Sequence, residues 1–297
     1  MVVWLIGIAM LGFILWAVWH EQQLRQQSGV LVQQRETLSE QRRALADQQQ
    51  QERVQQRTQS SDEALAWLAA DERMPEALQT LATLLPQSTA DEQWRLLTAL
   101  CERLQARYGG QQLEPPLPPE LLPWLQLLSR RPEGFRGRGG QRDCLRLQDL
   151  QLPGLELAGF NLRGAELRAC NFASARLPGL DLFAASCEAV SLEAAELAGA
   201  NLTGASFTQV RLDRARLSKA ELITAELRDC SLQEADLSGA ALRGVRLSRC
   251  DLRGANLAGA TGLSYQQLLS CRLDAHTRLP ENLEPRRAEL LARSQGA

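Results

Sequence analysis

The sequence is poor in the residues on which most enzymes and nucleic-acid-binding proteins depend. Aromatic residues make up only 5% of its 297 residues, histidine occurs twice, and Lys219 is the sole lysine. A net charge of -2, from 33 basic and 35 acidic residues, excludes the basic excess that general nucleic-acid binding requires. There is no GxSxG, P-loop, HExxH or CxxC motif and no cysteine–histidine couple, because His20 ends an apolar run and His276 lies in the C-terminal tail. We therefore expect no enzymatic activity, no metal, no cofactor and no nucleic-acid partner.

The cysteines do not form the pattern of a disulfide framework. Their number is odd and their spacing is irregular, which favours reduced thiols in a cytosolic setting. The seven are Cys101, Cys144, Cys170, Cys187, Cys230, Cys250 and Cys271.

Residues 2–19 form an apolar run without a single charge. As a helix, this run would span roughly 27 Å, close to the thickness of a bilayer core. Trp4, Trp16 and Trp19 lie near its ends, where interfacial aromatics belong, and the basic start and cleavage site of a signal peptide are missing. Residues 1–20 are thus predicted to be a single-pass membrane anchor, with a buried core helix as the alternative. The arginines at positions 25, 35, 42 and 43 favour a cytoplasmic C-terminal side.

Residues 21–60 are polar, rich in glutamine and free of proline, which predicts a helical stalk. Leu24, Leu31, Leu38 and Leu45 recur every seven residues, but the second apolar position of each heptad holds Gln, Arg or Ser. A solvated single helix is one interpretation. The other is a weak parallel coiled coil, aided by the high local concentration in a membrane, and it predicts weak self-association through the stalk.

Residues 61–131 predict a small helical region. Its first helix is expected to begin at a cap formed by Ser61 and Asp62, and its second to cover residues 75–85 between two prolines. The third is expected from Thr89 to Tyr108, because its apolar residues recur at helical spacing. A proline-rich linker, a short helix near 124–130 and a loop at 132–142 rich in Gly and Arg follow.

From Leu147 to Leu257 the sequence repeats every five residues, in 23 units. The centre of each unit is Leu or Phe except at Cys187, and two places before it stands another apolar residue, most often Ala. A helix would wind the centres round all its sides, and one continuous strand would turn successive centres to opposite faces. The spacing of two within a unit instead indicates a short extended side, and a glycine two places after ten centres indicates a tight turn. Each unit is therefore one side and one corner of a coil.

Units such as AELAG, ANLTG and ADLSG make residues 143–262 similar to the pentapeptide-repeat family, whose unit is A-(D/N)-L-x-x. The resemblance implies an all-β fold, a right-handed quadrilateral β-helix with four units per coil. Residues 263–297 resemble the helical C-terminal cap of such proteins, which would cover the last coil. Residues 77–105 and the linker WLQLLSRRP resemble those of membrane-anchored bacterial members, which implies a bacterial inner-membrane protein.

The first coil differs from the rest of the repeat. Its small positions are occupied by large apolar residues, so we expect a wider coil that packs against the preceding helices. These residues are Leu145, Leu150, Leu155 and Phe160.

Stacking residues twenty apart assigns candidate surfaces to the coils. One outward column alternates in charge and is a candidate partner-binding ladder: Glu156, Arg176, Glu196, Arg216, Asp236 and Asn256. Beside it run small residues, from Ala158 to Ala258, which suit docking but which turn chemistry alone would also select. A third column turns Phe183 and Ile223 outward, either as a partner-binding apolar pair or as scattered surface residues. An inward column stacks Cys230 on Cys250, which fits a small apolar filler better than a disulfide or metal site.

Regular side-chain columns on a membrane-held rod predict a scaffold that binds unknown protein partners. The alternative, implied by the family resemblance, is a DNA-mimicking inhibitor or protector of a type II topoisomerase. Residues 143–262 hold 13 basic and 15 acidic residues, and this balance, together with the predicted anchor, counts against the alternative.

Overall fold

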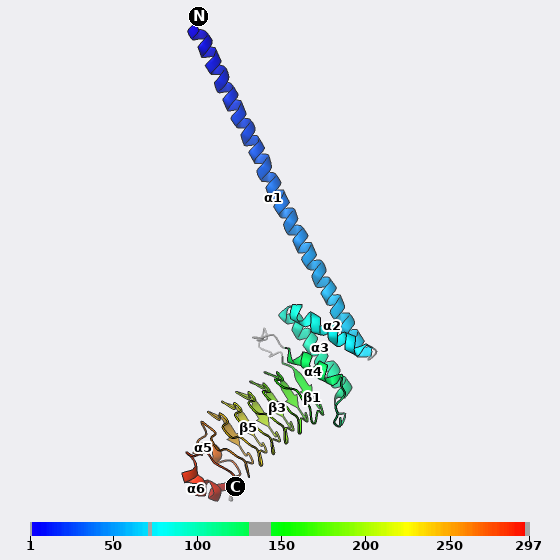
Figure 1. The fold of residues 1–297 in the computed structure, drawn as a ribbon, viewed down its shortest axis with the longest axis vertical. Helices are drawn as coiled ribbons and strands as arrows, with labels where there is room; N and C mark the ends of the chain where they lie inside the picture. The colour runs from blue at the N-terminus through cyan, green and yellow to red at the C-terminus, as the bar shows by residue number, and fades with distance from the viewer. Residues whose placement is uncertain (1, 71–72, 131–143, 295–297) are drawn as a thin grey trace. The chain divides into compact units, whose positions relative to one another are not determined.

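A long N-terminal helix, a small helical region and a solenoid make up the chain in the computed structural model (Figure 1). The described residues are 2–70, 73–130 and 144–294, and within the first range side chains are described for residues 12, 16–23 and 33–68. The chain divides into two units, Met1–Gln59 and Ser60–Ala297.

Helix α1, Val2–Ala70, is unbroken through the predicted stalk. Residues 21–60 contain no proline, and their many Gln, Arg and Glu residues propagate a helix well. The stalk leucines whose side chains are described, Leu38 and Leu45, are exposed. Both interpretations of the stalk leave these leucines on the surface of a single chain, so self-association through them stays a prediction.

The predicted anchor, residues 1–20, falls in the N-terminal part of α1. The side chains of residues 2–11 and 13–15 lie outside the described residues. In the part of the chain that the structure describes, no helix is long and apolar enough to cross a membrane. Membrane anchoring and its orientation therefore stay predictions.

The small helical region contains α2, Met74–Leu84; η1, Leu85–Gln87; α3, Ala90–Tyr108; and α4, Leu121–Ser129. A capping box confirms the predicted start of α3: the Thr89 hydroxyl accepts from the Glu92 amide, and the Glu92 carboxylate accepts from the Thr89 amide. The expected helix start at Ser61 and Asp62 is wrong, because α1 continues through both residues. Asp62 instead pairs with Arg95 of α3, with 2.9 Å between Oδ1 and Nη2.

Trp124 of α4 lies at the centre of the core of this region. Its ring meets that of Tyr108 edge-on, with 6.3 Å between centroids, and its Nε1 donates to the Leu100 carbonyl at 3.2 Å. The apolar face predicted for α3 is buried around it, and the end of α1 adds Ala64 and Leu68 to the same core. The helical region is therefore packed rather than a loose linker.

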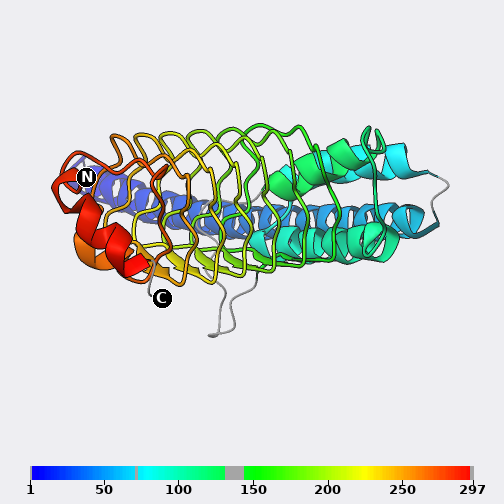
Figure 2. The same ribbon diagram turned by 90° about the horizontal axis from the view of Figure 1, so that it is seen from below.

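One side of the repeat is a parallel sheet of six short strands joined in chain order. Each residue pairs with the one twenty positions later, as Leu147 does with Leu167, so the predicted coil of four units is confirmed. Figure 2 shows these coils stacked along the solenoid. The strands are β1, Arg146–Gln148; β2, Glu166–Arg168; β3, Ser186–Glu188; β4, Ser206–Thr208; β5, Glu226–Arg228; and β6, Arg246–Ser248.

The other three sides of each coil pair in the same register through isolated bridges, such as that between Gln151 and Asn171. The residue two places after each centre makes the corner, and all 23 of these residues have a positive φ. Ten are glycine, in agreement with the predicted turns, and thirteen are other residues, among them Lys219 at a φ of 58°. The four-sided parallel solenoid is thus confirmed, while its right hand stays an expectation of the resemblance.

Helices α3 and α4 cover the first coil (Figures 1 and 2). Gln105 of α3 donates from Nε2 to the Arg146 carbonyl at 2.9 Å, and the Ser129 hydroxyl of α4 accepts from the Asn161 amide at 3.0 Å. All four large residues of the first coil are consequently buried: Leu145, Leu150, Leu155 and Phe160. The expected packing of this coil against the preceding helices is confirmed.

The C-terminal tail covers the opposite end with α5, Tyr265–Leu268; η2, Glu284–Arg286; and α6, Arg287–Ser294. It begins as an extra turn of solenoid, because Asp251 forms a parallel bridge with Arg272. The Asp274 carboxylate fastens this turn by accepting from the amides of Gly254 and Thr277, both at 2.9 Å. Burial acts to raise the pKa of Asp274, but these hydrogen bonds outweigh it and lower that pKa below its usual value.

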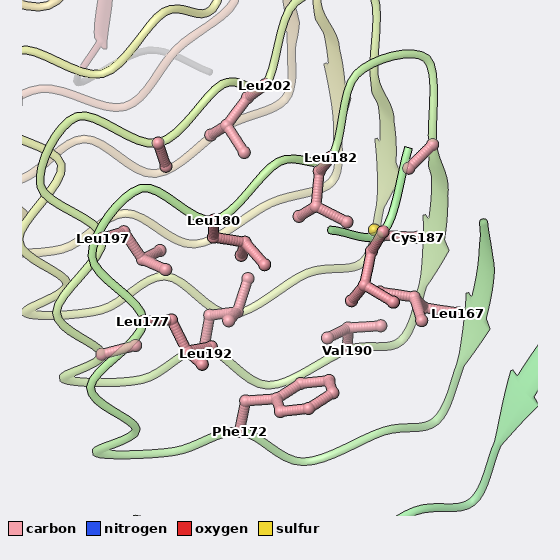
Figure 3. Packing of buried hydrophobic residues seen from close by; sticks show 14 of the residues in the cluster. Leu167, Phe172, Leu177, Leu180, Leu182, Cys187, Val190, Leu192, Leu197 and Leu202 are labelled. Carbon is pink, nitrogen blue, oxygen red and sulfur yellow. The ribbon is translucent and has the colours of Figure 1, made fainter. Parts of the chain in front are cut away.

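The solenoid interior is filled by inward side chains, which Figure 3 shows around the second and third coils. An apolar cavity of about 10 Å³ lies there, and its lining offers no polar group that could hold an ordered water. Cys187, the one centre that is neither Leu nor Phe, is in register with Leu167, which lines this space, although Cys187 itself does not line it. Because this short centre gives Leu167 less to pack against, we attribute part of the cavity to it. Its lining consists of Leu162, Leu167, Phe172, Leu177, Leu180, Leu182, Val190 and Leu192.

Replacing Cys187 with leucine should raise the free energy of unfolding by up to about 1 kcal/mol, because the longer side chain fills apolar space. The same exchange at Cys230, which is buried away from the cavity, should lower the free energy of unfolding by about 1–3 kcal/mol through overpacking. Urea unfolding of both variants beside the unchanged protein measures the two effects. Equal losses in the two variants would contradict our explanation of the cavity.

Candidate interaction surfaces

A column of alternating charge runs down one side of the solenoid, and we call it the charge ladder. Arg176 contacts the carboxylates on both sides of it, Glu156 at 3.4 Å and Glu196 at 3.3 Å, and Arg216 contacts Glu196 at 3.3 Å. The hydrogen bond to Glu196 raises the pKa of Arg176. The arginine side chains remain 62% and 70% exposed, so the predicted ladder is present and accessible. Its members are Glu156, Arg176, Glu196, Arg216, Asp236 and Asn256, each bridged to the next.

A second outward column on the same side carries only small side chains, and we call it the small-residue column. Its members sit at the first position of each corner turn: Ala158, Pro178, Ala198, Ser218, Ser238 and Ala258. The equivalent turn position on the next side holds Arg163, Phe183 and Ile223. Turn chemistry therefore accepts large residues at this position, and small size is a property of this side of the solenoid. We refer to the side with the charge ladder and the small-residue column as the ladder face.

The candidate apolar pair is not a bare hydrophobic patch. Phe183 is 38% exposed, but the Arg163 guanidinium lies over its ring, 4.3 Å from the centroid. Arg163 also pairs with Asp181 at 3.0 Å, and Ile223 is half-buried. Arg163 precedes Phe183 by one coil in the same column, so the twenty-residue spacing identifies this partner. The sequence prediction missed it because it considered apolar residues alone.

The repeat matches a family model described as a pentapeptide repeat region over residues 180–257. These residues are a pentapeptide repeat region. The match covers the coils that carry most of the ladder face, and the register of twenty residues extends the same architecture on both sides of it.

Several solved structures are similar to this chain. One is alr5209, a pentapeptide repeat protein from Nostoc Pcc 7120, with 29% identity, 40% of this chain and 80% of that chain covered, and a TM-score of 0.30. Rfr23, a pentapeptide repeat protein from the cyanobacterium Cyanothece 51142, has 22% identity and a TM-score of 0.21, and the match covers 43% of this chain and 87% of that chain. QnrB1, a plasmid-mediated fluoroquinolone resistance protein, has 17% identity and a TM-score of 0.25, and the match covers 51% of this chain and 88% of that chain. A search of curated proteins found no match.

The cysteines of the pentapeptide-repeat solenoid act as inward packing residues. Cys230 and Cys250 are buried and free, and their thiols donate to backbone carbonyls of the preceding coil, those of Phe207 and Leu227. Burial raises the pKa of Cys170 to about 11, which leaves little thiolate at neutral pH. The interpretation of this column as a small apolar filler agrees with these contacts.

No group of three potential metal ligands occurs among the residues that the structure describes. Pentapeptide-repeat solenoids are generally interaction proteins without catalytic activity. The outer columns of the solenoid are therefore its candidate functional surfaces.

Replacing Glu156, Arg176, Glu196 and Arg216 together with glutamine should leave the melting temperature nearly unchanged, because exposed ion pairs add little stability. Thermal unfolding followed by circular dichroism measures this. The same number of exchanges at charged pairs of the strand side, beginning with Arg146 and Glu166, is the matched control. A drop of about 10 °C for the ladder variant alone would show that the ladder holds the coils together.

Proposed function

We propose that this pentapeptide-repeat protein is a membrane-anchored scaffold that binds protein partners and performs no catalysis. The observation that carries the proposal is the combination of a filled interior with regularly spaced, exposed side-chain columns. A solenoid whose interior is filled by apolar side chains acts through its surface, and repeat proteins commonly bind partners along such extended faces. The uncharged run at residues 2–19, which opens the long helix α1, supports the anchor.

In this proposal, residues 1–20 hold the protein in a bacterial inner membrane with the C-terminal part in the cytoplasm. The stalk determines how far a partner can lie from the membrane, and tethering raises the local concentration of the solenoid. The arginines that follow the apolar run and the seven free thiols support this orientation.

The proposal is tested by in-cell crosslinking with affinity capture of the full chain, beside a variant without residues 1–20. We expect the full chain to resist carbonate extraction from membranes and to capture partners that the shortened variant loses. A third variant, in which an unrelated membrane-spanning helix replaces residues 1–20, is the matched control and should regain them. Capture of the same partners by the shortened variant would remove the anchor from the proposed function.

The candidate residues Phe183 and Ile223 are tested in the same capture experiment. Because Arg163 covers the Phe183 ring, a partner that uses this surface has to displace or include that guanidinium. Exchange of both residues for glutamate should then abolish binding of such a partner. If every captured partner stays bound, this surface takes no part in binding.

The second candidate, an inhibitor or protector of a type II topoisomerase, rests on the family resemblance. The nearly equal numbers of acidic and basic residues in 143–262 count against a DNA mimic, which needs an excess of negative charge. A gyrase supercoiling assay with the full chain in detergent decides between the two. Potent inhibition would favour this candidate over the scaffold.

A further inference from the structure

The ladder face combines two features that a partner surface needs. The small-residue column leaves half of this face without long side chains, so a flat partner can approach closely, as between packed sheets about 10 Å apart. The charge ladder on the other half presents alternating signs at a spacing of one coil, about 4.8 Å. A matching partner therefore needs the opposite alternation at the same spacing.

A second copy of this chain has that alternation. The copy is related to the first chain by a twofold axis. This axis lies in the interface, is perpendicular to the solenoid axis and passes between the third and fourth coils. The rotation places the two ladders against each other and makes the two solenoids antiparallel. Glu196 then faces Arg216 of the copy, and Arg176 faces its Asp236. The outermost pair is Glu156 with the neutral Asn256, so no like charges meet anywhere along the ladder.

The small-residue column obeys the same operation. Ala198 meets Ser218 of the copy, Pro178 meets its Ser238, and small side chains therefore lie against small side chains along the whole face. Rotation about an axis parallel to the solenoid would instead place each ladder charge over a small uncharged residue, which desolvates the charge without an oppositely charged partner. The antiparallel arrangement is the favoured one.

The other sides of the solenoid lack this property. On the strand side, the antiparallel operation sets Arg146 against Arg246 and Glu166 against Glu226, which repel each other. The two remaining sides carry few charges in the equivalent columns: one begins with Gln151 and the other with Asn161. Among the described sides, charge complementarity to a second copy is confined to the ladder face.

We propose that the ladder face is a self-association surface that takes a second copy of this chain in an antiparallel, twofold arrangement. Six coils give a face about 29 Å long, and about three extended residues per side make it about 10 Å wide. Its area of about 300 Å² is smaller than the roughly 800 Å² per partner of a stable dimer. The association is therefore weak, and concentration in a membrane or high protein concentration favours it. It stands apart from the scaffold proposal, because it needs neither the anchor nor another protein.

The test is sedimentation of the full chain in detergent at low salt, at concentrations up to about 0.2 mM. Glu196→Arg sets arginines against each other on both sides of the twofold axis, and Arg216→Glu sets carboxylates against each other there. Each variant alone should associate at least tenfold more weakly than the unchanged chain. An equimolar mixture of the two variants restores opposite charges at both positions and should recover the association.

The matched control is a pair of exchanges on the two remaining sides, Arg211→Glu and Glu221→Arg. They should leave association unchanged, because the antiparallel operation sets these exposed residues against the uncharged Ser191 and Asn201. Circular dichroism verifies that every variant is folded. A monomeric unchanged chain at about 0.2 mM, association that persists in both ladder variants, or a mixture that fails to recover would each overturn the proposal. Association through the stalk is distinguished by its indifference to all four exchanges.

Discussion

Replacing Phe207 with alanine should lower the free energy of unfolding by about 3–5 kcal/mol, the largest loss that we expect from a single exchange in the solenoid. Phe207 is the centre of β4 and is 1% exposed. Its neighbours in register are Cys187 and Leu227. Cys187 is the shortest centre, so the side chain in the preceding coil cannot reach into the space that the Phe207 ring would leave. A large cavity would therefore remain.

Urea unfolding measures this loss, and Phe183→Ala is the matched control. The same atoms are removed there from a side chain that is 38% exposed and covered on one face by Arg163. We expect the control to lose less than about 1 kcal/mol, which reflects the contact with the guanidinium and little burial. Similar losses for the two phenylalanines would mean that the inward position of Phe207 contributes nothing beyond its surface area.

The Phe207 variant also tests how far the coils unfold together. In a repeat protein each coil contacts only its neighbours, so a weakened fourth coil can separate the unfolding of the two ends. Hydrogen exchange should then show faster exchange around β4 and slower exchange in the coils capped by α3. Uniform exchange throughout the solenoid would indicate a single cooperative unit.

The coil register could be predicted because every unit has the same length and the same spacing of apolar residues. The apolar pair spaced by two fixes which residues point inward, and the fixed length of five stacks Leu147 on Leu167 and Glu156 on Arg176. Glycine revealed the corner at ten units, and periodicity alone places the other thirteen, since Lys219 at a φ of 58° has no local signal for a left-handed turn. The order of the coils and the charge ladder follow from this register.

Features that depend on how far a side chain reaches or on tertiary contacts could not be predicted from the sequence. Ser61 and Asp62 resemble a helix cap, but nothing before them breaks α1, and Asp62 finds its partner in Arg95, 33 residues away. Arg163 reaches from one column to Asp181 in another, so column stacking alone does not reveal that pair. The cavity beside Leu167 depends on how its eight lining side chains pack together, so the short centre at Cys187 does not by itself reveal it in the sequence.

Replacing Gly262 with alanine should lower the free energy of unfolding by about 2–4 kcal/mol and loosen the C-terminal cap. Gly262 has a φ of 75°, and a Cβ added there would lie 2.7 Å from the Arg243 Cα and 2.8 Å from its backbone nitrogen. Both contacts are with the backbone of a corner in the coil below, which cannot rotate away as a flexible side chain would. The backbone therefore has to shift at the junction between the solenoid and its C-terminal cap.

Gly199→Ala is the matched control for the conformational part of this effect. Gly199 has a φ of 65°, but an added Cβ would meet nothing within 4 Å, and thirteen other corners accept a side chain at positive φ. The control should therefore lose only about 1 kcal/mol. The difference between the two variants measures the clash with Arg243.

Limited trypsin digestion locates the effect, because Arg272 and Arg278 are exposed in the cap turn and become cleavable when that turn opens. We expect cleavage at these arginines to accelerate in Gly262→Ala and to stay slow in Gly199→Ala, since detachment of the cap exposes Leu263 and Leu268. Equal stability and equal cleavage in the two variants would mean that the corner at Arg243 moves freely. In that case the last coil would be held by its hydrogen bonds to the cap, such as that from the Gly254 amide to Asp274, rather than by close packing at Gly262.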